Sequence, residues 1–109
     1  MLRSAVFHPE ALRTIRTFPE DVRRELGKAI FDLQQGETLK MPLSRPMVTV
    51  GSGVEEIRIR DRSGYYRAFY LARSEKRVLV FHAFMKKHRK TPHSQIDLGK
   101  RRLREMLNG

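Results

Sequence analysis

Two arginines and a histidine are the residues of this sequence best suited to chemistry. Arg58, Arg67 and His82 each lie in a separate stretch whose residues alternate or are mostly apolar, as in a β-strand. The planar guanidinium group of arginine matches the oxygens of a phosphate, and histidine exchanges a proton near neutral pH. Such a set fits metal-independent cleavage of RNA, in which a base removes the 2′-OH proton, cations stabilise the phosphorane and an acid protonates the leaving 5′-oxygen.

Three more residues complete this candidate catalytic set. Glu56 precedes Arg58 by two positions, and it is either the base or one half of a structural ion pair. Lys86 and Lys87 follow His82 and contribute positive charge or, with a depressed pKa, a proton. His82 lies among apolar residues, a setting that predicts a hydrogen-bonded core histidine as readily as a catalytic one. The residues by themselves leave these roles open.

Several classes of site and protein are excluded or disfavoured by composition. The chain has no cysteine, which excludes a disulfide, a thiolate metal site and a cysteine nucleophile. No metal-ligand spacing of histidines and no glycine-rich phosphate loop is present, so we expect neither a metal nor a cofactor. No apolar run approaches membrane-spanning length and no signal-peptide core follows the first residues, so we expect a cytoplasmic protein without a membrane partner.

The positive charge is concentrated in the second part of the chain. The protein has 109 residues and a formal net charge of +11. Residues 1–45 contain eight Lys/Arg against six Asp/Glu, whereas residues 46–109 contain fifteen against six. Residues 86–90 form the densest cluster. This asymmetry indicates nucleic acid, an acidic protein or an anionic membrane surface as partner, with a merely solvated basic face as the simpler alternative.

The elements that must position these residues follow from periodicity and turn signals. In chain order we expect a strand at 4–8, helices beginning at Pro9 and Pro19, a helix end near Gly36, strands at 55–61, 65–72 and 78–85, and a helix from Pro92 to Asn108 with Thr91 as its N-cap. Residues 37–53 contain prolines and glycines and predict a loop, with a short edge strand at Met47–Val50. Polar turns at 63–64 and 74–77 join the last three strands into an antiparallel meander.

These elements predict a single α+β domain spanning residues 1–109. Its small antiparallel sheet should carry the two N-terminal helices on one face, with the C-terminal helix packed on that same side. The two isoleucines of the 55–61 strand should face the helices, which places Glu56, Arg58 and Arg60 on the opposite face. Arg67 lies mid-strand next door, and its register against Arg58 is not determined by alternation.

Three segments carry a resemblance to a known family. They are GVEEIR at 53–58, YRAFY at 66–70 and HAFMKKHRKTP at 82–92. The chain resembles the RelE/ParE toxin superfamily and, within it, the phage-derived, HigB-like branch. That branch has a Glu-hydrophobic-Arg strand, a Tyr-Arg-x-x-Tyr strand and a His-Ala-Phe-x-Lys-Lys-x-x-Lys-Thr-Pro signature in this order. The N-terminal segments FPEDVR at 18–23 and LQQG at 33–36 are also similar to its second helix, so the resemblance covers most of the chain.

The resemblance implies a toxin of a type II toxin–antitoxin pair, a ribosome-dependent endoribonuclease that cuts mRNA in the decoding site. The implied partners are the ribosome and mRNA, a cognate antitoxin with a helix-turn-helix domain, and operator DNA through the antitoxin complex. The candidate catalytic residues are Glu56, Arg58, Arg67, His82, Lys86 and Lys87. The candidate RNA-binding residues are Arg60, Phe84, His88, Arg89, Lys90, Arg101 and Arg102.

Two other functions remain alternatives at this stage. The same fold serves gyrase-inhibiting toxins of the ParE type, which bind a protein and have no nuclease chemistry. The paired arginines, His82 and the basic segment after it argue against that alternative, because protein binding does not require them. A nucleic-acid-binding module without catalysis is the third hypothesis, and it predicts steeply salt-dependent binding without toxicity.

Overall fold

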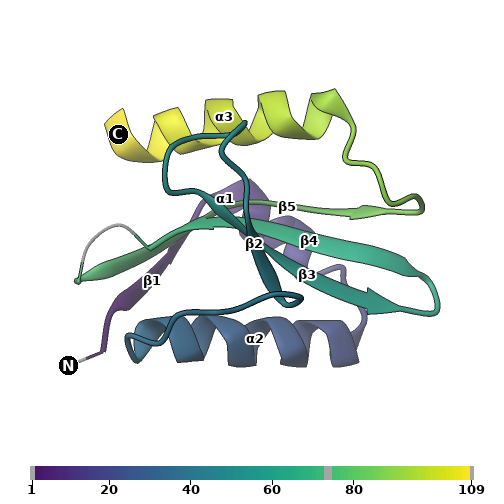
Figure 1. Ribbon diagram of the computed structural model, residues 1–109, viewed down its shortest axis with the longest axis horizontal. Coiled ribbons are helices and arrows are strands. Elements are labelled where there is room, and N and C mark those ends of the chain that lie inside the picture. Colours follow the sequence, from purple (N-terminus) through teal and green to yellow (C-terminus); the bar gives the residue numbers. More distant parts are fainter. Residues whose placement is uncertain (1, 73–74, 109) are drawn as a thin grey trace.

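A five-stranded sheet lies between helices that cover its two faces (Figure 1). The computed structural model describes residues 2–72 and 75–108. In chain order the elements are β1 (Ser4–Phe7), α1 (Pro9–Ile15), α2 (Glu20–Gln34), β2 (Ser44–Pro46), β3 (Glu55–Asp61), β4 (Gly64–Leu71), β5 (Arg77–Lys86) and α3 (His93–Asn108). The expected α+β class is confirmed.

The sheet is mixed, which corrects the expectation of a fully antiparallel one. Its strand order is β1-β5-β4-β3-β2. The β3–β4–β5 meander is antiparallel as predicted, and β2 adds an antiparallel edge. β1 pairs with β5 in parallel. The chain between β1 and β5 includes two helices, and parallel pairing is the arrangement that such a long crossover permits.

α2 covers one face of the sheet through a regular apolar stripe. The helix begins after Pro19 and has two acidic residues in its first turn. Their negative charge stabilises the helix by interacting with the positive end of its dipole. Its buried residues are Val22, Leu26, Ala29, Ile30 and Leu33. They pack with Ile57 and Ile59 of β3 in the larger of the two apolar clusters. Gly36, with φ +90°, ends the helix as expected, because glycine adopts this conformation without strain.

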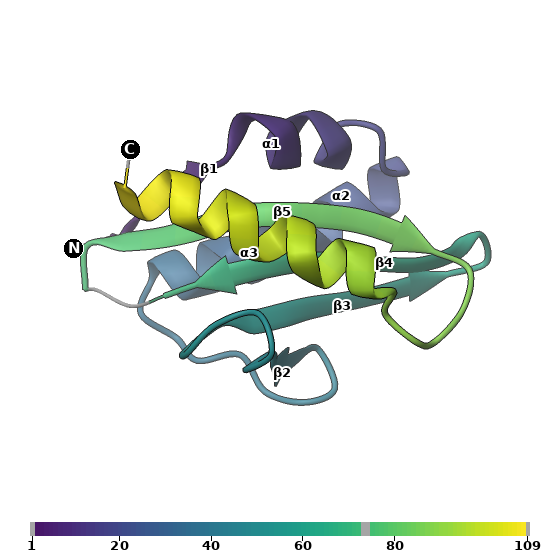
Figure 2. The ribbon, with the colours of Figure 1, turned by 90° about the horizontal axis from the view of Figure 1, so that it is seen from above.

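α3 lies on the opposite face, above β5, and not on the face covered by α2 as expected (Figures 1 and 2). That face carries its own apolar cluster, in which Phe69, Phe81 and Phe84 pack against Leu103 of α3. A register shift between β4 and β5 at Phe69/Tyr70 lets all three rings lie on the face away from α2, so a second layer is needed to remove them from water. Figure 2 shows that α3 does not extend over β3 and β2.

Three local details of the chain differ from the expected boundaries. The edge strand is Ser44–Pro46 and not Met47–Val50, which forms a turn closed by the Val50 N–H bonding to the Met47 carbonyl at 3.0 Å. α3 begins at His93, one residue after Pro92. Ser74, part of the expected 74–77 turn, lies outside the described residues. In the ranges that are described, no helix has the length and apolar character needed to cross a bilayer.

Candidate active site

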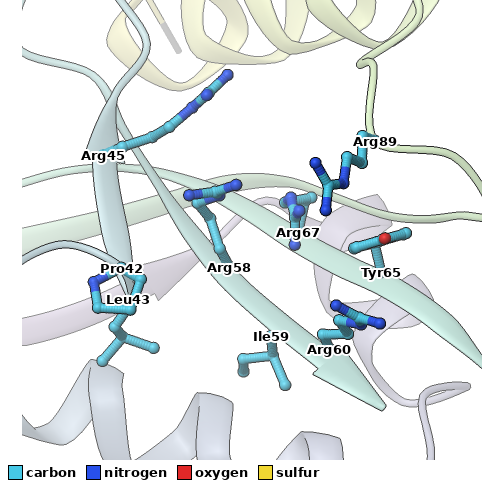
Figure 3. A pocket seen from close by; sticks show the side chains of 9 residues that line it. All are labelled: Pro42, Leu43, Arg45, Arg58, Ile59, Arg60, Tyr65, Arg67 and Arg89. Carbon is cyan, nitrogen blue, oxygen red and sulfur yellow. The ribbon is translucent and has the colours of Figure 1, made fainter. Parts of the chain in front are cut away.

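The part of the α3-side face that α3 leaves open contains a pocket of about 620 Å³ (Figure 3). We call it the arginine pocket. Its lining residues are Pro42, Leu43, Arg45, Arg58, Ile59, Arg60, Tyr65, Arg67 and Arg89. Five of these nine are arginines, and they come from β2, β3, β4 and the loop that follows β5. The cations gathered here are therefore distant in sequence.

Arg58 and Arg67 form the centre of this pocket. They are directly paired across β3 and β4, so that both side chains project from the same face. Figure 3 shows the two guanidinium groups side by side, with that of Arg89 next to Arg67. The side chain of Arg67 is 4% exposed and that of Arg58 is 29% exposed. The register of β3 against β4, which alternation does not determine, places these two arginines on a shared face, and Arg60 also lines the pocket.

Glu56 lies at the floor of the cluster and is 1% exposed. Its Oε1 atom lies 3.5 Å from Arg45 Nε, 3.7 Å from Arg58 Nε and 3.7 Å from Arg67 Nε. One carboxylate thus faces three guanidinium groups, and it offsets the charge of one of them. Glu56 thus orients the guanidinium groups, and the positive charge that it does not offset is available to an anion.

Glu56, Arg58 and Arg67 each have one buried polar atom without a hydrogen-bond partner among the described residues. Glu56 Oε2, Arg58 Nε and Arg67 Nε have no hydrogen-bond partner within the described chain. Burial lowers the pKa of Arg67, Glu56 opposes that effect, and the neighbouring charges of Arg58 and Arg45 add to it. The two arginine donors and the lowered pKa of Arg67 indicate that the positive charge of the cluster is under-compensated. A bound phosphate would supply acceptor oxygens and negative charge to the arginines.

Tyr65 forms one wall of the arginine pocket and is half-buried. The guanidinium carbons of Arg60 and Arg67 lie 5.4 Å and 5.3 Å from the centre of its ring. Contacts of this kind attract a cation to an aromatic face and restrict its movement. The ring therefore helps to fix the direction in which Arg67 presents its donors.

His82, expected as a candidate acid or base, lies outside the arginine pocket and is 1% exposed. Its Nδ1 lies 2.8 Å from Nη1 of Arg102, and its Nε2 lies 2.7 Å from Oε1 of Gln95. Because arginine can only donate, Nδ1 accepts and Nε2 carries the proton that Gln95 accepts. Burial lowers the pKa of His82 to about 4, a shift to which the charge of Arg102 also contributes. His82 is thus neutral and joins α3 to the sheet.

Lys86 is also buried, at 8% exposure, beside the arginine pocket. Its Nζ donates to the carbonyl of Arg89 and, at 2.9 Å, to the hydroxyl of Thr91. Thr91, expected as a helix N-cap, is used here to hold the loop that follows β5. Burial lowers the pKa of Lys86, and the nearby charge of Arg67 acts in the same direction. In this conformation the ammonium group anchors the loop that carries Arg89.

The other residues expected at the site are divided between the surface and the interior. Lys87, His88, Lys90 and Arg101 are exposed, and none of them lines the arginine pocket. Phe84, expected to contact RNA, is 5% exposed, and its ring is stacked with that of His82. Arg102, also expected to contact RNA, is half-buried and bonded to His82. The side chains of Phe84 and Arg102 therefore contact His82 in this conformation and do not face solvent freely.

Arg45 is the pocket residue that the sequence did not indicate. It lies in a segment without periodicity, between Pro42 and Pro46. β2 places it directly opposite Glu56 in the neighbouring strand. The one available signal was a lone cation between two prolines, which predicts an exposed loop as readily as a site. In residues 2–72 and 75–108, we find no group of three or more His, Cys, Asp or Glu that could hold a metal.

Comparisons with known proteins give a family and a fold. A family model described as phage-derived protein Gp49-like matches residues 13–104. A mutant of the E. coli toxin RelE in the free state is 19% identical, with a TM-score of 0.54, over 97% of this chain and 99% of that one. The isolated E. coli RelE toxin is 24% identical, with a TM-score of 0.55, over 86% of this chain and 93% of that one. A search of curated protein sequences gives no significant match. The resemblance expected from the sequence motifs is confirmed.

Proposed function

Since this chain belongs to the family of phage-derived Gp49-like proteins, we propose that it is the toxin of a toxin–antitoxin pair and cuts mRNA on the ribosome. The reaction is attack of a ribose 2′-OH on the adjacent phosphodiester, which forms a new P–O bond and expels the 5′-oxygen. The proposed partners are the ribosome with its mRNA and a cognate antitoxin with a helix-turn-helix domain. Operator DNA is reached through the antitoxin complex.

The observation that supports this function is the pairing of Arg58 and Arg67 across β3 and β4 inside an open pocket. Negative charge builds up on the phosphorane oxygens during RNA cleavage, and preorganised donors stabilise that charge strongly. Two guanidinium groups held side by side by Glu56 are preorganised in this sense. We therefore assign phosphate binding and transition-state stabilisation to Arg58 and Arg67, and positioning of both to Glu56.

The same geometry suggests why the activity would depend on the ribosome. Glu56, His82, Lys86 and Lys87 are the candidate groups for proton transfer. Of these, His82 and Lys86 have their polar atoms bonded to other groups of the protein. Of the residues that line the arginine pocket, only the five arginines and Tyr65 can ionise. Binding of ribosome-held mRNA would then complete the set of groups needed for proton transfer. In this proposal His82 positions α3, and Lys86 positions the loop that carries Arg89.

The test is to induce the chain briefly in cells and to map the 5′ and 3′ ends of transcripts. We expect growth arrest and cuts confined to translated regions. Purified protein should cut a message on ribosomes and should leave the same free RNA intact. Arg67→Ala should lower the rate of cutting by about 10²–10³, the usual loss on removal of one donor to a developing oxyanion.

A matched control keeps the change of charge and moves it away from the pocket. Arg104→Ala removes an exposed arginine of α3 and should leave cutting unchanged. A folded, soluble Arg67→Ala variant that still arrests growth would contradict the assigned role of the arginine. DNA-damage signalling with intact mRNA would instead favour a gyrase-inhibiting toxin. Salt-sensitive RNA binding without cutting or toxicity would favour a non-catalytic module.

A further inference from the structure

A second groove of about 550 Å³ adjoins the arginine pocket. One side is formed by the end of β2 and the turn after it, and the other by the loop after β5 and the first turn of α3. Arg45 and Arg89 line both the groove and the arginine pocket. Figure 3 shows Arg45 directed toward α3 and Arg89 directed toward Arg67. The two hollows therefore meet at this pair of cations.

Arg45 makes contacts on both sides of that junction. Its Nε lies 3.5 Å from Glu56 Oε1, on the side of the arginine pocket. Its Nη2 lies 3.8 Å from the sulfur of Met47, on the side of the groove. Arg89 is held opposite, because Lys86 bonds to its carbonyl. A linear polyanion leaving the arginine pocket would pass between these two guanidinium groups.

The groove has fewer arginines than the arginine pocket and a continuous run of apolar residues along one wall. Pro46, Met47 and Val48 form that run, Ile96 contributes from α3, and Lys90 also lines the groove. The side chain of Val48 is 73% exposed, the most exposed of the large apolar residues in the described chain. An apolar surface between cations matches a nucleotide, whose base has two apolar faces and whose flanking phosphates are anionic.

We propose that this groove binds the base of the nucleotide next to the cleaved phosphodiester, and that it sets the sequence preference of cutting. This inference rests on the proposed function, because the arginine pocket must hold the phosphate that leads the strand into the groove. The contact is apolar packing against Val48 and its neighbours. Arg45 and Arg89 contact the RNA backbone where the strand passes from the arginine pocket into the groove.

The experiment is an NMR titration of the purified chain with two probes. The first probe is a trinucleotide with 2′-O-methyl riboses, which cannot be cut, and the second is inorganic phosphate. The trinucleotide should shift the methyl signals of Val48 and the Nε–H signals of Arg58 and Arg67. Phosphate should shift only the arginine signals. A probe-specific response of Val48 is the signature of a bound base.

Two variants with the same change of charge make the test quantitative. Val48→Asp should weaken trinucleotide binding about tenfold, because it removes apolar contact and repels the flanking phosphates, while phosphate binding stays within twofold of wild type. Phe31→Asp, at a half-exposed position of α2 on the other side of the sheet, should change neither. In transcript-end maps, the neutral Val48→Ser should alter the nucleotide preference at one position beside the cut.

The remaining outcomes separate this proposal from the proposed function. If the trinucleotide shifts the arginine signals but not Val48, and both Val48 variants cut with unchanged preference, the groove is not a base site and the nuclease proposal stands. If the wild type cuts no RNA on ribosomes, the nuclease proposal fails first. If Val48→Asp spares the trinucleotide but weakens binding of the antitoxin, the groove belongs to a protein partner and the proposal is overturned.

Discussion

The two faces of the sheet are built from different kinds of side chain. The face beneath α2 is apolar, and the residues of α2 and β3 that meet there are almost fully buried. The face beneath α3 carries aromatic rings, a neutral histidine, a buried carboxylate and the buried Arg67. α3 itself contributes only Gly99 and Leu103 as buried residues, and it is also held by the polar contacts of His82.

This difference indicates that stability and chemistry are assigned to opposite sides of the same strands. Burial of the α2 face stabilises the fold, and polar groups there have partners within the protein, as where the hydroxyls of Ser44 and Tyr70 bond to each other at 2.8 Å. The α3 face carries unpartnered donors on Arg58 and Arg67, which cost stability unless a ligand compensates them. Adjacent residues in β3, such as Ile57 and Arg58, thus have different roles. Mutations on the two faces should separate folding from function.

The largest expected effect on folding comes from the α2 face. Leu26→Ala should lower the free energy of unfolding by about 2–5 kcal/mol, because Leu26 is 3% exposed and its truncation leaves a cavity. Urea unfolding measures this loss. At temperatures where the variant remains folded, cutting per folded molecule should equal that of wild type.

Arg67→Ala provides the reverse case for the same comparison. It should keep an unfolding midpoint close to wild type, because it removes one of three guanidinium groups that share a single carboxylate. Loss of folding in Arg67→Ala, or loss of activity in folded Leu26→Ala, would show that the two faces are not functionally separate.

The next effect concerns acid and the histidine beneath α3. The unfolded chain binds a proton at His82 below its ordinary pKa of 6.5, whereas the folded chain does so only near its lowered pKa of about 4. This residue therefore makes no contribution to the pH dependence above pH 6.5. As the pH falls from 6.5 to 4, it lowers the free energy of unfolding by about 3 kcal/mol.

His82→Gln should lack that part of the slope in urea unfolding measured across this pH range. His88→Gln, at an exposed loop position, should retain it. NMR titration of the ring of His82 in the wild type checks the same point without a variant. A ring that titrates near 6.5 in the folded protein would show that α3 does not enclose it in solution.

The smallest effect compares a glycine in each helix. A Cβ at Gly99 of α3 would lie 2.8 Å from Cδ2 of Phe69, so Gly99→Ala should cost about 1–3 kcal/mol of stability through overpacking. A Cβ at Gly27 of α2 would meet nothing within 4 Å, and Gly27→Ala should stabilise the protein by up to about 1 kcal/mol. Thermal unfolding measures both. If Gly99→Ala stabilised the protein as Gly27→Ala is expected to do, the close packing of α3 on β4 would be contradicted.

Much of the fold could be predicted because local patterns determine it. The stripe of α2 and the alternation of β3 indicated which residues lie inside, and the structure confirms both. The edge strand was placed at Met47–Val50 because apolar residues there resemble a strand. The structure uses Ser44–Pro46 instead, since pairing with β3 depends on a neighbour that a local pattern does not contain.

The candidate site was predictable to the extent that it lies on regular strands. Alternation predicts that Arg58 lies on the face away from Ile57 and Ile59, since a strand places every second residue on one face. Only the register of β3 against β4 shows that Arg67 lies beside it. Arg45 was not, because its role depends on lying opposite Glu56. His82 was assigned to chemistry from its residue type, and only the contacts of α3 show that both of its ring nitrogens are occupied.

The helices, the meander and the alternation within each strand can be predicted from the sequence, because they depend on neighbours along the chain. The pairing that brings Arg67 beside Arg58 depends on the register between two strands. Only the tertiary structure decided what covers the face on which these arginines lie. Phe69 and Tyr70 of β4 pair with His82 and Val80 of β5, so Phe81 has no partner and β5 carries a bulge. The bulge turns Phe81 and His82 toward α3 together, which strict alternation would forbid. Pairing, bulges and helix placement follow from contacts between distant segments. Those contacts place the arginine pocket on the part of the sheet that α3 does not cover.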